Sequence, residues 1–150
     1  MHRTTLVTRI GVGLSSLVLV GTGATLASAH PAQTTTTCID HDCQGGFADP
    51  TGCSKDARTI RSAPITNLTT GRVVGWIDLR WSPTCGNNWA RTRSAVGSAT
   101  LTAKATRHDG KTALNAGTGS WIATTMLFGR EQCVMASGSV NGASASTPCA

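Results

Sequence analysis

The sequence of 150 residues is poor in large aromatic and acidic side chains, with no Tyr, two Phe and a single Glu, Glu131. Small residues take their place, and they bury little apolar area, which stabilises a fold by about 25 cal/mol per Å². Ordering the backbone costs about 1–2 kcal/mol per residue. We therefore expect the hydrophobic core to need covalent reinforcement.

The sequence also lacks a long apolar run. Its longest apolar stretch, residues 10–20, follows Arg3 and Arg9 and precedes an Ala27-Ser28-Ala29 motif. That stretch is shorter than the roughly 20 residues of a membrane-spanning helix, and this order of features is typical of a cleaved signal peptide. We expect three parts and no membrane span after cleavage: a signal peptide (1–29), a flexible tail (30–37) and a single secreted domain (38–150).

Basic residues do not cluster. The formal net charge is +6, but no run of five or more basic residues is present. The polybasic pattern of nucleic-acid-binding proteins is thus missing, and we expect no nucleic-acid partner. Long-range attraction to anionic cell-wall polymers is compatible with this charge.

The six cysteines fit an exported protein. They are Cys38, Cys43, Cys53, Cys85, Cys133 and Cys149. Zinc sites usually carry two closely spaced cysteine pairs, and only Cys38 and Cys43 come near that spacing. Export places the thiols in an oxidising compartment. We expect three disulfides and no metal site, with all 15 connectivities left open.

Alternating apolar and polar residues over 73–81 and 99–107 predict half-buried strands. Asp109-Gly110 predicts a hairpin turn into residues 111–114. Further expected elements are a strand over 56–62 ended by Pro64, a helical turn over 87–91, and a strand pair formed by 120–128 with 132–136. Cys149 is expected to hold back an otherwise loose C-terminal segment. The predicted fold is mainly β, a small antiparallel sandwich or barrel stapled by disulfides, with at most one short helix.

Tryptophan and arginine are the residues that binding surfaces favour. The alternation over 73–81 places Trp81 in the core with Ile77 and Leu79, and it places Asp78 beside Arg80 as an ion pair. On the opposite face, or close by in sequence, lie four candidate binding residues: Trp76, Arg80, Trp89 and Arg91. The alternative is structural, with Trp76 as a second core contact and Arg91 as a stacked cation.

No catalytic constellation is recognisable. A G-x-S-x-G elbow is absent, and His108 precedes the expected hairpin tip, an exposed place that suits a general base poorly. Asp40, Asp42 and Asp49 crowd the first cysteine loop without the order of an EF-hand calcium loop. We therefore predict no catalytic residue, no metal and no cofactor.

Several motifs together resemble the DUF2690 family of actinobacterial and Bacillus-type proteins. They are DPTGCSKDART (49–59), LRWSPTC (79–85), WAR (89–91), HDG (108–110) and TTML (124–127). Trp81 stands where the family usually has Tyr, and Thr125 where Pro is usual. The resemblance spans roughly residues 43–133 and implies secretion and a shared fold, but no activity and no site residues.

Three hypotheses for function remain. The first is an extracellular binding module for a protein or a cell-envelope polymer, which predicts Trp76 or Trp89 exposed beside arginine. The second is a structural envelope protein without a specific ligand, which predicts that all four tryptophans are buried. The third is a small hydrolase that uses His41 with Asp40 and Asp42, which predicts a pocket around a histidine.

Overall fold

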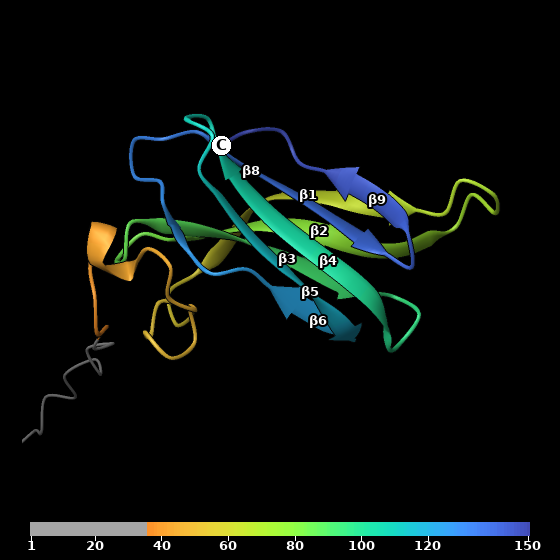
Figure 1. The fold of residues 1–150 in the computed structure, drawn as a ribbon, viewed down its shortest axis with the longest axis horizontal. Coiled ribbons are helices and arrows are strands. Elements are labelled where there is room, and N and C mark those ends of the chain that lie inside the picture. The colour runs from red at the N-terminus through yellow and green to blue at the C-terminus, as the bar shows by residue number, and fades with distance from the viewer. Residues whose placement is uncertain (1–35) are drawn as a thin grey trace, which may run out of the picture. The chain divides into compact units, whose positions relative to one another are not determined.

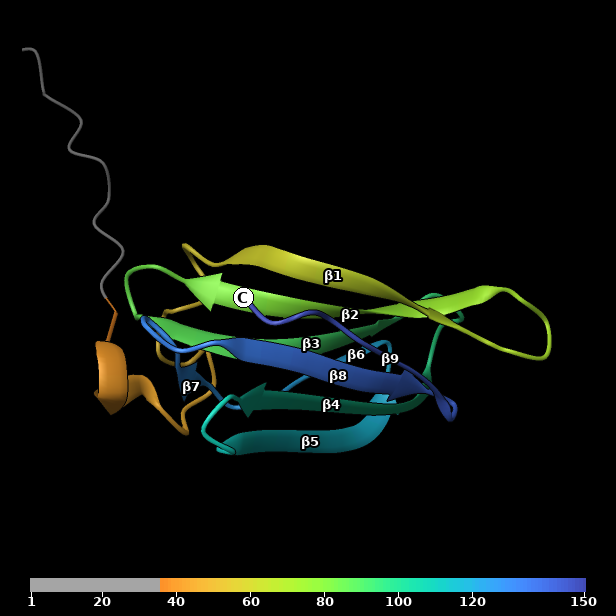
Figure 2. The same ribbon diagram turned by 90° about the horizontal axis from the view of Figure 1, so that it is seen from above.

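A computed structural model describes residues 36–150, which fold into two antiparallel β-sheets packed face to face (Figures 1 and 2). The sheets are not closed into a barrel, so the predicted fold class is confirmed in the form of a sandwich. The described part holds one helix, the single 3-10 turn η1 (Asp40–Cys43), and no helix there is long and apolar enough for a membrane crossing. The expected signal peptide and residues 30–35 of the expected tail lie outside the described residues.

Sheet A has five strands and sheet B has four. In sheet A, β2 lies between β1 and β3, and β6 and β7 both pair with the other edge of β3. Its strands are β1 (Arg58–Thr66), β2 (Val73–Ser82), β3 (Asn87–Ser94), β6 (Trp121–Ala123) and β7 (Leu127–Phe128). Sheet B is ordered β5-β4-β8-β9, with β4 (Ala99–Arg107), β5 (Thr112–Gly119), β8 (Val134–Val140) and β9 (Ala143–Ser146).

The main core lies between the two sheets and is built from alternate residues of each strand. β4 and β8 alternate buried and more exposed positions along their whole length, as a strand with one solvated face requires. Many core residues are small, so the sheets approach closely: Thr92 Oγ1 of β3 donates a hydrogen bond of 2.7 Å to the Thr102 carbonyl of β4. At Gly138 of β8 a Cβ atom would overlap both of these oxygen atoms.

Trp81 is not part of this core, although it was predicted to be. Ile77 and Leu79 are fully buried between the sheets, whereas Trp81 is half-buried and lies outside the core cluster. Trp81 is the next-to-last residue of β2, beyond the last residue that this strand contributes to the core. Alternation alone does not show where the opposite sheet stops covering a strand.

Three predicted elements differ from the structure because pairing partners override local sequence. The first strand runs through Pro64 instead of ending there, since β1 is an edge strand of sheet A and tolerates a residue without an N–H group. Residues 87–91 are not helical: they belong to β3, a central strand. Residues 120–128 and 132–136 do not pair, because β6 and β7 join sheet A while β8 joins sheet B.

Two features of sheet B agree with prediction. Asp109 and Gly110 connect β4 to β5, and Gly110 has a φ of 88°, a conformation that glycine adopts without a Cβ clash. At the C-terminus, β8 and β9 form a hairpin, and Cys149 is bonded to Cys133. The Ser/Gly-rich end of the chain is therefore held in place, as expected from its final cysteine.

Candidate binding site

The four candidate binding residues lie on the outer face of sheet A, away from the main core. In the register of β2 and β3, Arg80 stands opposite Trp89, Asp78 opposite Arg91, and Trp76 opposite Arg93. Alternate residues of paired strands share one face, so this register brings the predicted residues together. Arg93, not selected from the sequence, continues the same alternation by two residues.

Trp89 is buried rather than exposed. Only 4% of its surface is accessible, and it packs with Cys43, Cys53, Cys85 and Met126 in a second, smaller core. The Arg80 guanidinium lies 6.0 Å from the centre of the Trp89 ring, within the range of a cation–π contact. Trp89 is therefore a buried residue beneath the candidate site, where it packs against the Arg80 side chain.

Trp76 is exposed beside an arginine, as the binding hypothesis predicted. It is 36% exposed, and the Arg93 guanidinium lies 5.5 Å from its ring centre. Trp121 of β6 is still more open, at 56%. The burial of all four tryptophans, which the structural hypothesis predicted, is not observed.

Asp78 pairs with Arg91 and Arg93 instead of Arg80. Its carboxylate accepts hydrogen bonds from Arg91 Nη2 at 3.0 Å, Arg93 Nε at 2.8 Å and Ser62 Oγ at 2.8 Å, and its side chain is 1% exposed. Burial alone would raise the pKa of Asp78, but the hydrogen bonds from Arg93, Ser62 and Arg91 outweigh it and hold the pKa below its ordinary value. The cross-strand partner of Asp78 is Arg91, so pairing between strands wins over closeness in sequence.

Arg80 contacts no carboxylate among the described residues. Its guanidinium donates to Thr59 Oγ1 at 2.8 Å and to the Ala57 carbonyl at 2.9 Å. Burial lowers the pKa of Arg80, and the positive charge of the neighbouring Arg91 lowers it further. The three arginines of this face thus carry more positive charge than the single buried carboxylate between them balances.

A pocket of about 890 Å³ opens on this face, between β3, β6 and the loop of residues 47–54. We call it the sheet A pocket. Three of the four candidate residues line it, and Trp76 does not. The principal lining side chains are Phe47, Arg80, Trp89, Arg91, Arg93 and Trp121. A volume of this size suits a small ligand or a short piece of a polymer.

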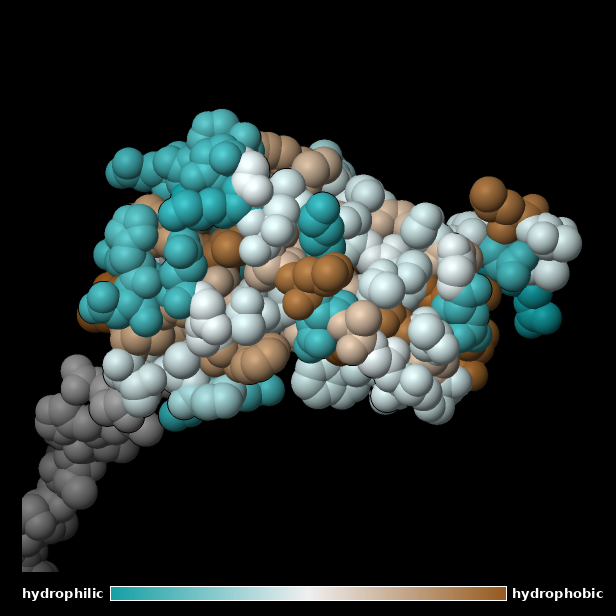
Figure 3. Space-filling model, viewed as in Figure 1, coloured by the Kyte–Doolittle hydropathy of each residue, from teal (hydrophilic) through white to brown (hydrophobic). Residues whose placement is uncertain are grey.

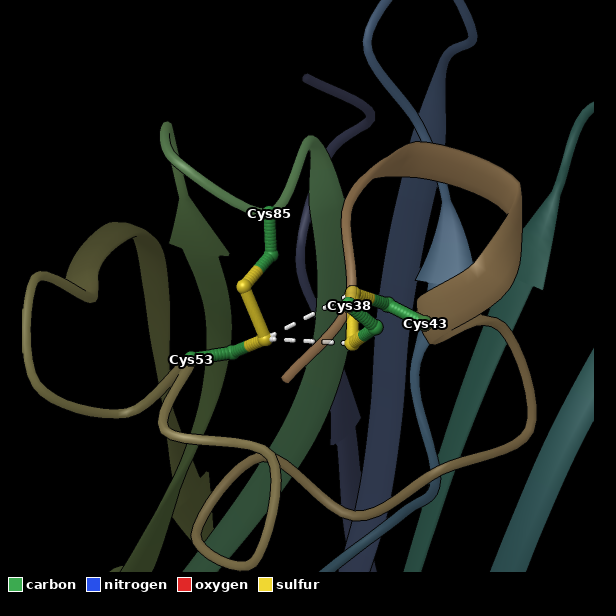
Figure 4. Close-up of side chains that lie close together, drawn as sticks. All are labelled: Cys38, Cys43, Cys53 and Cys85. Carbon is green, nitrogen blue, oxygen red and sulfur yellow. Dashed lines mark hydrogen bonds between the residues drawn. A yellow bond between two sulfur atoms is a disulfide. The ribbon is translucent and has the colours of Figure 1, made fainter. Parts of the chain in front are cut away.

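One disulfide anchors the loop that forms one wall of the pocket, and a second disulfide packs against the first. Cys38 is bonded to Cys43, and Cys53 at the end of the loop is bonded to Cys85, between β2 and β3. Figure 4 shows the two bridges side by side: Cys53 Sγ lies 3.7 Å from Cys43 Sγ and 4.0 Å from Cys38 Sγ. The predicted use of the cysteines as staples is confirmed, and their connectivity follows from the fold.

The sulfur cluster is also the one described group of side chains with the spacing of a metal site. All four sulfur atoms lie within 4.8 Å of one another. Zinc binds thiolates, and in the two disulfides these sulfur atoms are bonded to each other. In the acidic loop, Asp40 Oδ1 pairs with Arg130 Nη2 at 2.9 Å.

The two histidines considered for hydrolysis stand apart from the sheet A pocket. His41 is exposed and stacks on Phe128, with ring centres 3.9 Å apart. His108 is exposed at the turn between β4 and β5, as predicted, and lines a smaller pocket of about 270 Å³ beside the Cys133–Cys149 disulfide. Neither histidine is among the residues that line the sheet A pocket with the candidate arginines.

Residues 41–137 match the family model described as "Protein of unknown function (DUF2690)". The chain belongs to this family. No curated protein and no solved structure matches the chain. The DUF2690 region contains every lining residue of the sheet A pocket and both cysteines of the Cys53–Cys85 bridge. The pocket therefore lies wholly inside the part of the chain that defines its family membership.

Sequence reasoning missed three large side chains of the site: Phe47, Arg93 and Trp121. Phe47 reaches the pocket because the loop folds back through Cys53, and the cysteine pairing could not be chosen from the sequence. Trp121 reaches it because β6 pairs with β3 rather than with β8. No local signal identified either residue, whereas Arg93 would have followed from the assignment of residues 87–94 as a strand.

Proposed function

We propose that this DUF2690 protein is an exported binding module that holds an extracellular partner in the sheet A pocket. The observation that carries the proposal is the pocket itself, because it joins three arginines from neighbouring strands to an exposed tryptophan on β6. Tryptophan and arginine dominate the energetics of binding sites. The leader-like N-terminal sequence and the disulfides support export, since disulfides persist in oxidising compartments.

The outer face of sheet B carries mainly small polar side chains. Figure 3 shows that face as mostly pale, of intermediate hydropathy, and its strands carry Thr and Ser side chains such as Thr102, Ser137 and Ser139. Two larger exposed side chains, Leu114 and Lys104, stand opposite each other there. They provide matched controls for substitutions at the pocket.

The proposal can be tested by retention of the secreted protein on cell-envelope fractions. The wild-type protein is expected to be retained, and Trp121→Ala, which removes an exposed ring at an edge strand, is expected to abolish most of the retention. Leu114→Ala removes a side chain that is 68% exposed on the other sheet and should leave retention unchanged. No retention of the wild type, or equal losses in the two variants, would contradict the proposed function.

A further inference from the structure

The charge of the sheet A pocket is unbalanced toward the cationic side. Arg80, Arg91 and Arg93 line it, and Asp78 lies buried beneath Arg91 and Arg93, with its oxygen atoms taken by them and by Ser62. Asp49 lies in the lining and is exposed. Two carboxylates thus face three guanidiniums, and Arg80 contacts neither carboxylate within the described residues.

All three guanidiniums still have N–H groups without an acceptor among the described residues: Arg80 uses Nη1 and Nη2, and its Nε stays without one. Arg91 uses Nε and Nη2 on Asp78, and so does Arg93. Within the described part of the chain, Nη1 of both residues has no acceptor, and their side chains are 30% and 42% exposed. A planar guanidinium with free N–H groups suits the oxygen atoms of a carboxylate or a phosphate.

The rest of the lining suits sugar rings. Phe47 and Trp121 present open aromatic faces, 49% and 56% exposed, on which the apolar C–H faces of a sugar can pack. Ser94, Ser120 and Asn115 add hydroxyl and amide groups. Asn115 donates its amide N–H to the Ala123 carbonyl, which orients the side chain and leaves its oxygen atom as an acceptor for a sugar hydroxyl.

We propose that the sheet A pocket binds an anionic glycan, with the arginines on its carboxylate or phosphate groups and Trp121 and Phe47 against its sugar rings. This assignment rests on the binding function proposed above and names the ligand class. The combination of open aromatic rings with hydroxyl and amide groups favours a glycan over an acidic peptide. Burial and then repulsion from Arg91 lower the pKa of Arg80, and a bound anion would offset that repulsion.

The test measures binding of the full secreted protein to defined polymers. Polygalacturonate supplies carboxylates, phosphorylated dextran supplies phosphates, neutral dextran supplies rings without charge, and polyglutamate supplies carboxylates without rings. We expect binding to one or both anionic glycans, weakened by added salt, and at least about tenfold weaker binding to neutral dextran and to polyglutamate, because losing a charge-assisted contact or a stacked ring costs about this much.

Two variants and two controls locate the contact. Arg80→Gln and Trp121→Ala are each expected to weaken glycan binding about tenfold. Lys104→Gln removes the same charge, and Leu114→Ala an exposed apolar group, on the outer face of sheet B; both should bind within about twofold of wild type. Trp121 stands exposed on the edge strand β6, so its substitution tests the contact even where Arg80→Gln impairs folding.

The outcomes separate the ligand class from the function. Binding to neutral dextran or polyglutamate as tight as to the anionic glycans would overturn the glycan assignment, as would an equal loss in Lys104→Gln. If the wild-type protein binds none of the four polymers but Trp121→Ala still abolishes envelope retention, the proposed binding function stands and the anionic glycan is ruled out as its ligand. If the wild-type protein shows neither glycan binding nor envelope retention, both the ligand class and the binding function are contradicted.

Discussion

At the scale of single residues, the buried carboxylate of Asp78 organises the outer face of sheet A. It is 1% exposed and accepts hydrogen bonds from two arginines and a serine. A buried carboxylate is stable only when its oxygen atoms are paired. Asp78 therefore sets the positions of Arg91 and Arg93 and, through them, the cationic side of the pocket.

Replacing Asp78 with Asn should destabilise the protein at neutral pH. The charge-assisted hydrogen bonds weaken, and we expect the free energy of unfolding to fall by about 1–3 kcal/mol, toward the lower end because both arginines are partly open to solvent. Urea denaturation at pH 7 measures this loss. A variant as stable as wild type would contradict the organising role of Asp78.

The same residue predicts a pH dependence. Because the folded-state pKa of Asp78 is below its unfolded value, its contribution is fully present above the unfolded carboxyl pKa of about 4 and is lost as the pH falls below it. The stability difference between wild type and Asp78→Asn should therefore be largest at neutral pH and shrink as the pH falls from about 4 through the folded-state pKa. A difference that stays constant over this range would contradict the assigned shift.

Gly138 tests the close approach of the two sheets. A Cβ atom there would overlap Thr92 Oγ1 and the Thr102 carbonyl, which are joined by the inter-sheet hydrogen bond. Gly138→Ala is expected to lower the free energy of unfolding by about 1–3 kcal/mol, as overpacking usually does. Gly117→Ala is the control, since a Cβ there would make only an ordinary contact of 3.5 Å with Ile122. Equal stabilities of the two variants would contradict the packing described.

At the scale of elements, the strands with clear alternation were predictable and the pairing between distant strands was not. β2 and β4 follow from period-2 patterns that reflect one buried face. β3 begins with Asn87 and Asn88, residues poor at forming strands, and becomes a strand because β2 lies on one side and β6 and β7 on the other. Strand propensity is judged from each residue by itself, whereas these pairing strands come from elsewhere in the chain.

The candidate site shows the same division. Arg80 was identified because it lies on the outer face of the strand predicted over 73–81, and Trp89 and Arg91 because they lie close together in sequence. Their partners across the pocket were not, because Phe47 depends on the Cys53–Cys85 bridge and Trp121 on the pairing of β6. The residues that one β-hairpin contributes to a site can be predicted from the local sequence. The loop that closes the site cannot, because its position depends on contacts distant in sequence.

The wall of the sheet A pocket should depend on the Cys53–Cys85 bridge and not on the Cys133–Cys149 bridge. We expect Cys53→Ala with Cys85→Ala to lower the free energy of unfolding by about 2–4 kcal/mol and to abolish retention on envelope fractions, because the loop of residues 47–54 is no longer anchored. Cys133→Ala with Cys149→Ala should also destabilise the fold but keep retention. Equal loss of retention in both double variants would show that the first bridge has no special part in the pocket.

At the scale of the whole molecule, disulfides compensate for a core of small residues. The space between the sheets is filled largely by Ala, Val, Leu and Ile, with alanines such as Ala103, Ala105 and Ala136 at its centre. The second core is made mainly of cysteines around Trp89 and Met126. The scarcity of large aromatic residues and the presence of six cysteines thus have one physical explanation, and it was available from composition alone.

The role of the disulfides is tested most directly by mapping them in the protein purified without reductant, by mass spectrometry of its peptides together with a count of reactive thiols. We expect no free thiol and three linked pairs, Cys38–Cys43, Cys53–Cys85 and Cys133–Cys149. Free thiols at Cys38, Cys43, Cys53 and Cys85, with a bound zinc ion, would contradict this expectation.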